Sequence, residues 1–158
     1  MKIYQIPRRT VAVRLLLDDG RTLDGAMFTS PTGPNGQPED VLRHMNDTTE
    51  EFVPLLGERE SVLVNKARII WIRLDGEAAD EIQNGGISGR SVPVSLTLSG
   101  GDSLAGALSV VMPAERNRVV DFLNASGRFV PLFEDSAVTL VQKAFVASVR
   151  SAETGTPF

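Results

Sequence analysis

The chain contains one unit twice, and this repetition constrains its fold more than any other feature. Residues 9–73 and 90–150 are diverged copies of each other. Residues 52–55 (Phe-Val-Pro-Leu) return unchanged at 129–132, and the Leu-Val-Asn-Lys-Ala of 63–67 returns as Leu-Val-Gln-Lys-Ala. An internal repeat decides the architecture, because each copy is one structural unit whose neighbours help to bury its apolar face.

The repeat also predicts the domain organisation. A unit of this size buries too little of its surface to be comfortably stable alone, so we expect the two units to pack as one globule with a shared core. We assign residues 1–76 to the first unit and 90–151 to the second. Residues 77–89 are acidic and then glycine-rich, which is typical of a linker, with one helical turn at 78–82. Residues 152–158 are a frayed tail.

Each unit begins with the pattern of a β-hairpin. Apolar residues alternate with other residues in the opening segment, at Val11, Val13, Leu15 and Leu17. This period of two is typical of a half-buried strand. The turn at residues 18–21 contains Asp-Gly, a strong hairpin signal, and predicts a second strand over 22–29.

Glycine interrupts that second strand in both copies. Gly25 is matched by Gly106. A glycine within a strand costs stability unless a bulge, a bend or a close backbone approach requires it. We therefore expect a sharply bent strand, as a small barrel would need.

The remainder of each unit predicts a short helix and three strands. Apolar spacing favours helices over residues 41–46 and 119–124. Residues 52–56 and 129–133 predict short strands, and their prolines place these strands at a sheet edge or a bulge. Residues 62–72 and 139–149 each predict two further strands. The fold class is therefore mainly β with short helices (α+β). We expect two small barrel-like or bent-sheet units, each ordered strand, strand, helix, strand, strand, strand, related by a pseudo-two-fold axis.

Composition excludes several classes of function. The chain has no cysteine and a single histidine, His44, so we expect no disulfide, no thiol nucleophile and no metal site. We expect no cofactor either. Its net charge is −4 and its pI about 5.0, which disfavours a nucleic-acid partner. No apolar run is long enough to span a membrane and the N-terminus lacks a signal-peptide core, so we predict a cytoplasmic protein.

Basic residues recur at matched places and form the candidate binding site. Lys66 and Lys143 follow the same strand in the two copies, and each would contact a phosphate or carboxylate on a partner or stand as a solvated turn lysine. Arg9 and Arg90 open the two units, where arginine usually pairs with a neighbouring carboxylate or extends to solvent.

Two further residues complete the candidate site. Arg68 belongs to the same basic set. Trp71, the only tryptophan, is replaced by Ser148 in the second copy, and it either anchors a partner at an exposed interface or packs between the halves.

One acidic cluster is a candidate for catalysis. Asp18, Asp19 and Asp24 lie around the first hairpin, and paired carboxylates can bind a cation or act as acid and base. The second copy has only Asp102 nearby, and an Asp-Gly turn needs its aspartate for geometry. The structural interpretation is therefore favoured, and we predict that the protein is not an enzyme.

The first hairpin, residues 13–28, resembles the first signature of the Sm-like small barrels: apolar alternation, Asp-Gly-Arg, Leu, and then Gly25. Residues 63–72 are similar to the closing strand pair of that family. The resemblance implies a small barrel that binds nucleic acid, but the helix at 41–46 interrupts its strand order, and its nucleobase-binding Asp and Asn have no clear counterpart. The recurring Phe-x-Pro-Leu and Asn-Lys elements also resemble an uncharacterised bacterial domain, which implies no function.

These observations favour a non-catalytic adaptor or scaffold that binds other proteins, through an exposed strand edge. Duplicated units with similar edges suit assembly, because one half can form with another molecule the contact that it makes with its sibling. A homo-oligomer is therefore one expected form. The alternative is an Sm-like nucleic-acid binder using Arg9, Lys66, Arg68 and their second-copy counterparts.

Overall fold

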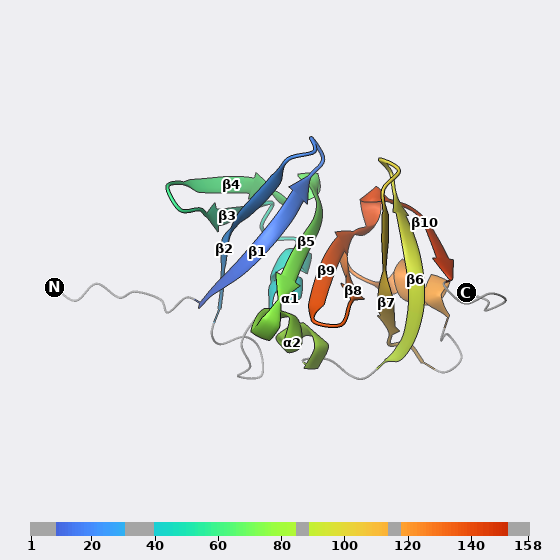
Figure 1. Ribbon diagram of the computed structural model, residues 1–158. Coiled ribbons are helices and arrows are strands. Elements are labelled where there is room, and N and C mark those ends of the chain that lie inside the picture. Colours follow the sequence, from blue (N-terminus) through green and yellow to red (C-terminus); the bar gives the residue numbers. More distant parts are fainter. Residues whose placement is uncertain (1–8, 31–39, 85–88, 114–117, 152–158) are drawn as a thin grey trace.

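The computed structural model describes residues 9–30, 40–84, 89–113 and 118–151. Its strands form a single ten-stranded antiparallel sheet in the order β10-β6-β7-β8-β9-β5-β1-β2-β3-β4, with short helices beside it (Figure 1). The predicted mainly β fold with short helices is thus confirmed. Within the described residues, no helix has the length and apolar character needed to cross a membrane.

The two halves have the same order of elements. The first half contains β1 (Arg9–Leu17), β2 (Thr22–Thr29), α1 (Val41–Asn46), β3 (Phe52–Leu56), β4 (Ser61–Asn65), a 3₁₀ turn (Lys66–Arg68) and β5 (Ile69–Asp75). The second contains β6 (Arg90–Leu98), β7 (Ser103–Val110), α3 (Val119–Ala125), β8 (Phe129–Phe133), β9 (Ala137–Gln142), a 3₁₀ turn (Lys143–Phe145) and β10 (Val146–Ser151). The predicted order of strand, strand, helix and three strands is therefore found in each half.

The segment between the halves is more ordered than a linker. Helix α2 (Gly76–Asn84) occupies most of it and contacts β5 and β9. Its Ala79 and Ile82 are buried in the core of the first half, which explains why the helix extends beyond the single predicted turn. Residues 85–88 of the predicted linker, and the predicted tail 152–158, lie outside the described residues.

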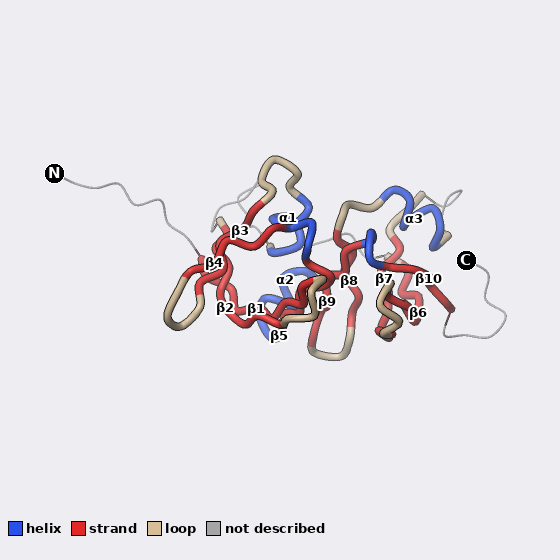
Figure 2. Tube along the Cα trace, turned by 90° about the horizontal axis from the view of Figure 1, so that it is seen from above, coloured by secondary structure: helices blue, strands red, loops and turns tan. Residues whose placement is uncertain are grey.

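The core follows the alternation in the sequence. Val11, Val13, Leu15 and Leu17 are all buried on one face of β1. Seen from above, β3, β2, β1 and β5 wrap around the space that this core fills (Figure 2). Within the described residues the ten strands nevertheless form an open sheet, and no pairing between strands closes either half into a barrel.

The halves join edge to edge through unlike strands. β5, the last strand of the first half, pairs with β9, the fourth strand of the second half. In a two-fold arrangement the same strand of each half would meet itself at the junction. The prediction of a pseudo-two-fold axis is therefore wrong: the halves follow each other head to tail along the sheet, with β4 at one end and β10 at the other (Figure 1).

The proline strands are neither at a sheet edge nor at a bulge, contrary to the prediction, because the ladders through Pro54 and Pro131 have a continuous register. β3 lies between β2 and β4, and β8 lies between β7 and β9. They tolerate proline because their second ladder is short. β3 pairs with β2 only at Leu55 and Leu56, and β8 pairs with β7 only at Phe133. Pro54 and Pro131 therefore each pair on one side only, with β4 and β9 respectively.

Gly25 and Gly106 are explained by a close approach between strands. A Cβ atom at Gly25 would lie 2.8 Å from Leu55 Cγ and 2.8 Å from the Leu56 carbonyl oxygen. At Gly106 the matching distances are 2.7 Å to Leu132 Cγ and 2.8 Å to the Phe133 carbonyl oxygen. Any side chain would push β2 away from β3, and β7 away from β8, where their ladders are shortest.

Gly106→Ala is therefore expected to destabilise the chain by about 1–3 kcal/mol, because the added methyl group overpacks a site bounded by a backbone carbonyl. The measurement is the urea midpoint at constant slope. Gly100→Ala is the control, since a Cβ at Gly100 meets nothing within 4 Å. Equal midpoints for the two variants would contradict the close approach.

Candidate functional site

The junction between the halves shows how this sheet joins one unit to another. Ile72 of β5 pairs with Leu140 of β9, and Arg73 pairs with Thr139. Beside this ladder, Arg73 Nη2 lies 2.8 Å from Glu134 Oε2. The contact thus combines a backbone ladder with an ion pair that is partly exposed to solvent.

A buried amide strengthens the same junction. The Gln142 side-chain Nε2 donates to the carbonyl oxygens of Lys66, at 3.1 Å, and Ile69, at 2.6 Å. Lys66 opens the 3₁₀ turn and Ile69 is the first residue of β5, so an amide of the second half satisfies main-chain groups on both sides of that turn in the first. Buried polar groups are costly unless paired in this way, so the pairing holds the turn in one arrangement.

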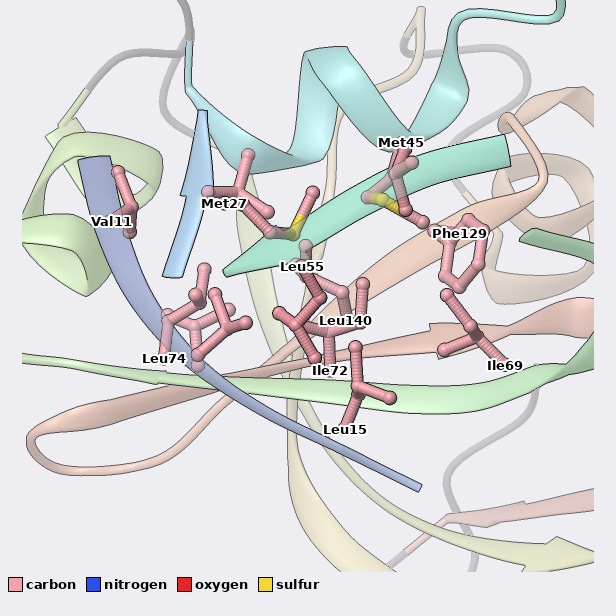
Figure 3. Packing of buried hydrophobic residues seen from close by; sticks show 14 of the residues in the cluster. Val11, Leu15, Met27, Met45, Leu55, Ile69, Ile72, Leu74, Phe129 and Leu140 are labelled. Carbon is pink, nitrogen blue, oxygen red and sulfur yellow. The ribbon is translucent and has the colours of Figure 1, made fainter. Parts of the chain in front are cut away.

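Phe129 of the second half is clamped into the first half. The Asn46 side chain accepts from Phe129 N at 2.7 Å and donates to Phe129 O at 3.1 Å. The ring is 1% exposed and lies beside Met45 and Ile69 (Figure 3). Gly127 makes room for the clamp, because a Cβ there would lie 2.7 Å from Asn46 Cγ. The core of the first half is therefore completed by the second.

Lys66 is a buried structural residue in this chain. Its side chain is fully buried, and its Nζ donates to the carbonyl oxygens of His44, at 2.9 Å, and Asp47, at 2.8 Å. These carbonyls lie at the C-terminal end of α1, where main-chain acceptors run short of helical partners, and His44 O otherwise accepts only a long hydrogen bond from Asp47 N at 3.4 Å among the main-chain bonds of this turn. Burial lowers the pKa of Lys66, and the nearby Asp47 partly offsets this effect. The expectation of a solvated turn lysine is wrong.

Lys143 occupies the matching place in the second half. Its Nζ donates to Leu123 O at 2.8 Å and to Ser126 O at 2.7 Å, at the end of α3. Its side chain is only half-buried. The recurrence of Lys-Ala after an apolar strand was the available sequence signal, and it marks a helix-end cap in both halves.

The other predicted site residues lie apart. Arg9 Nη2 is 2.6 Å from Glu81 Oε1, which ties β1 to α2. Arg68 Nη1 is 3.0 Å from Asp18 Oδ2, beside the opposite end of β1. Arg90 is exposed at the start of β6. Together with the two lysines beneath the helix ends, these residues do not form one basic surface.

Trp71 packs between the halves. It lies on β5, where it pairs with Leu16 on one side and Val141 on the other. Its side chain packs against the apolar cluster of the second half. Of the two interpretations of this residue, the structure supports inter-half packing.

The hairpin carboxylates are engaged in turn and strand contacts. Asp19 accepts from Arg21 N at 3.0 Å and Arg21 Nε at 2.7 Å, and these hydrogen bonds lower its pKa. Asp24 pairs with Arg14 Nε at 2.8 Å, which lowers its pKa as well. Asp19 and Asp24 therefore each pair with an arginine of the same hairpin.

The two ends of the sheet are the candidate binding surfaces. β4 pairs only with β3, and β10 pairs only with β6, in the described part of the chain. β4 carries large exposed apolar side chains: Leu63 is 69% exposed and its neighbour Val62 is also exposed. Phe52, at the start of β3 beside Asn65 of β4, is 53% exposed. The exposure of Phe52 could not be predicted from the sequence, because Phe52 and the buried Phe129 stand in identical segments.

A cavity of about 490 Å³ opens beside the other end of the sheet. Apolar side chains from β6, β7, α3, β8 and β10 line it, together with Asn124 and Lys143. Its volume falls in the range of pockets that accept an apolar group. It lies against β10 and so adjoins the second unpaired edge.

The described residues contain no group of three His, Cys, Asp or Glu side chains that could hold a metal ion. Their distinctive chemistry is an unpaired backbone edge with apolar side chains at one end of the sheet and an apolar cavity at the other. Comparison of the chain with protein-family models, curated proteins and solved structures gives no match.

Proposed function

We propose that this protein is a non-catalytic adaptor or scaffold component that joins other protein chains through the edge strands of its sheet. The observation that carries the proposal is β4. An edge strand presents unpaired N–H and C=O groups, and proteins usually protect such strands with lysine, proline or bulges. β4 has the sequence Ser-Val-Leu-Val-Asn, with no charged residue and no proline, and its Leu63 is largely exposed.

Strand addition suits this surface. An added strand would pair with the free backbone of β4, while side chains on alternate positions would choose the partner. The internal junction supports the proposal, because it already shows a strand of one half adding to the sheet of the other.

We further infer that the halves are duplicated bent-sheet units. Three matched backbone hydrogen bonds support this inference. Asp18 N donates to Arg68 O, as Ser99 N does to Phe145 O. Lys66 N donates to Glu51 O, as Lys143 N does to Arg128 O. Gly57 N donates to Glu60 O, as Glu134 N does to Ala137 O.

Sm-like nucleic-acid binding remains the competing proposal, and the charge distribution weighs against it. The net charge is −4, and the predicted basic residues are dispersed or buried. A Lys66→Glu variant would test folding rather than binding, so Arg68 and Arg90 are the appropriate positions for charge reversal.

The test is affinity capture from native lysate after nuclease treatment, with wild type, Leu63→Asp and Val111→Asp as baits. Val111 is an exposed valine beyond the end of β7, so it controls for the new charge. We expect proteins to be retained by wild type and Val111→Asp and lost from Leu63→Asp. Retention that needs nucleic acid, or that survives Leu63→Asp, would count against the proposal.

A further inference from the structure

The two free ends of the sheet are the counterparts of the two strands that meet inside the molecule. β5 corresponds to β10, and β9 corresponds to β4, because each pair occupies the same place in the repeated order of elements. The internal junction therefore joins a β5-type edge to a β4-type edge, and the molecule has one of each left over. We propose that β10 of one molecule pairs antiparallel with β4 of a second copy, head to tail. This inference rests on the proposed edge-strand function and names its partner.

The internal ladder predicts the register of the new one. Ile72 pairs with Leu140, and Arg73 pairs with Thr139. Shifting both strands to their repeat counterparts pairs Val149 with Leu63, and Arg150 with Val62. Leu140 is fully buried, whereas Leu63 is 69% exposed. The exposed leucine thus stands where its counterpart is covered by the other half.

The exposed phenylalanine has a matching vacancy. Phe129 sits in a cluster that includes Leu15, Met27, Met45, Val53, Ile69 and Ile72. The repeat counterparts of these six residues all line the 490 Å³ cavity: Leu96, Leu108, Leu123, Val130, Val146 and Val149. The cavity is therefore the place in the second half that corresponds to the Phe129 site. Phe52, the counterpart of Phe129, is the side chain that would fill it from a second molecule.

The hydrogen-bonding group of the clamp is also present. Asn124, which the repeat aligns with Asn46, lines the cavity. Asn46 holds both the N–H and the C=O of Phe129. Asn124 offers the same amide to the main chain of Phe52. One end of the molecule thus carries the exposed Phe52, and the other end carries the cavity that would receive it and the Asn124 amide that would hold its main chain.

Four differences set the strength of the contact. Ser148 stands where Trp71 packs between the halves. Asn65, whose Oδ1 accepts from Ala67 N at 2.9 Å, stands where Gln142 donates across the junction. Glu50 stands where Gly127 makes room for Asn46, and Gly57 stands where Glu134 pairs with Arg73. The intermolecular junction therefore lacks one ion pair and has a tighter fit at its clamp. We expect it to be weaker than the internal junction, so that assembly is reversible and depends on protein concentration. Unlike edges continue past two copies, giving a ring where the rotation closes and a filament where it does not.

The test uses the purified full chain and sedimentation velocity from low to high micromolar concentration. We expect species heavier than twice the 17.1 kDa chain, at proportions that rise with concentration. A chain that stays monomeric over the whole range would overturn the inference. Protein capture through β4 would then still support the adaptor function with a different partner. A chain that neither self-associates nor captures proteins through β4 would refute both proposals.

Complementary blocked variants make the test specific for head-to-tail pairing. Phe52→Asp with Leu63→Asp blocks the β4 end, and Ser148→Lys blocks the exposed rim of the cavity at β10. Each variant alone should be monomeric with a wild-type melting temperature. An equimolar mixture should form a 1:1 dimer and nothing larger, because each molecule keeps one working end. Self-association of the Ser148→Lys variant, or no dimer in the mixture, would overturn head-to-tail pairing. Val111→Asp should assemble like wild type.

Discussion

Phe129→Ala should destabilise the chain by about 3–5 kcal/mol, the usual loss for deleting a buried phenylalanine ring. The ring is 1% exposed and fills the core of the first half although it belongs to the second. Its removal leaves a cavity and also loosens the strand that Asn46 clamps. The free energy of unfolding in urea is the measurement. The protein should be dilute, so that self-association does not add apparent stability.

Phe52→Ala is the matched control for that variant. The two phenylalanines occupy the same place in the repeat, and Phe52 is 53% exposed. Its removal should change the stability of the dilute chain by no more than about 0.5 kcal/mol. Similar losses for the two variants would mean that the second half does not complete the first core.

Lys66→Met should lower the free energy of unfolding by about 2–4 kcal/mol. The variant keeps most of the apolar stem, but two carbonyl oxygens at the end of α1 lose the donor that Lys66 Nζ provides. Relief from burying the ammonium group offsets part of this loss. Lys143→Met should cost less, because Lys143 is only half-buried and water can reach its acceptors. Urea unfolding of both variants gives the comparison, and a larger loss for Lys143→Met would contradict the assignment.

The pH dependence separates burial of the charge from packing. Burial lowers the folded-state pKa of Lys66, so between this value and the ordinary lysine pKa, about 10.4, the unfolded chain binds the proton better. Stability therefore rises with pH across that window and is lost again as pH falls through the folded-state pKa. The wild type should gain stability over Lys66→Met as the pH increases toward that of a free lysine. A constant difference would show that the ammonium group is not desolvated.

Local patterns predicted much of each unit. The alternation from Val11 to Leu17 matches the buried face of β1, and the apolar spacing at residues 41–46 matches α1. Helix α3 is one residue longer than predicted. These features depend on neighbours in the sequence, and a pattern of neighbours is sufficient to reveal them.

Contacts between distant segments explain what the sequence could not predict. Pro54 and Pro131 lie in interior strands because the ladders beside them are short, and ladder length is a property of how strands meet. The local sequence of Lys66 is that of a turn lysine, and its burial depends on the contact with the end of α1. Phe52 and Phe129 share one local sequence, and only the placement of the second half against the first gives them opposite environments.

The order of strands across the sheet also limits how many halves a closed assembly can contain. One half already presents both kinds of edge, a β5-type edge and a β4-type edge. A half is therefore the smallest repeating block, and each chain contributes two such blocks that are covalently linked. A closed assembly of whole chains must therefore contain an even number of blocks, and every second junction in it is covalently linked through α2. Closure with an odd number of halves, which separate halves would allow, is thus excluded for whole chains.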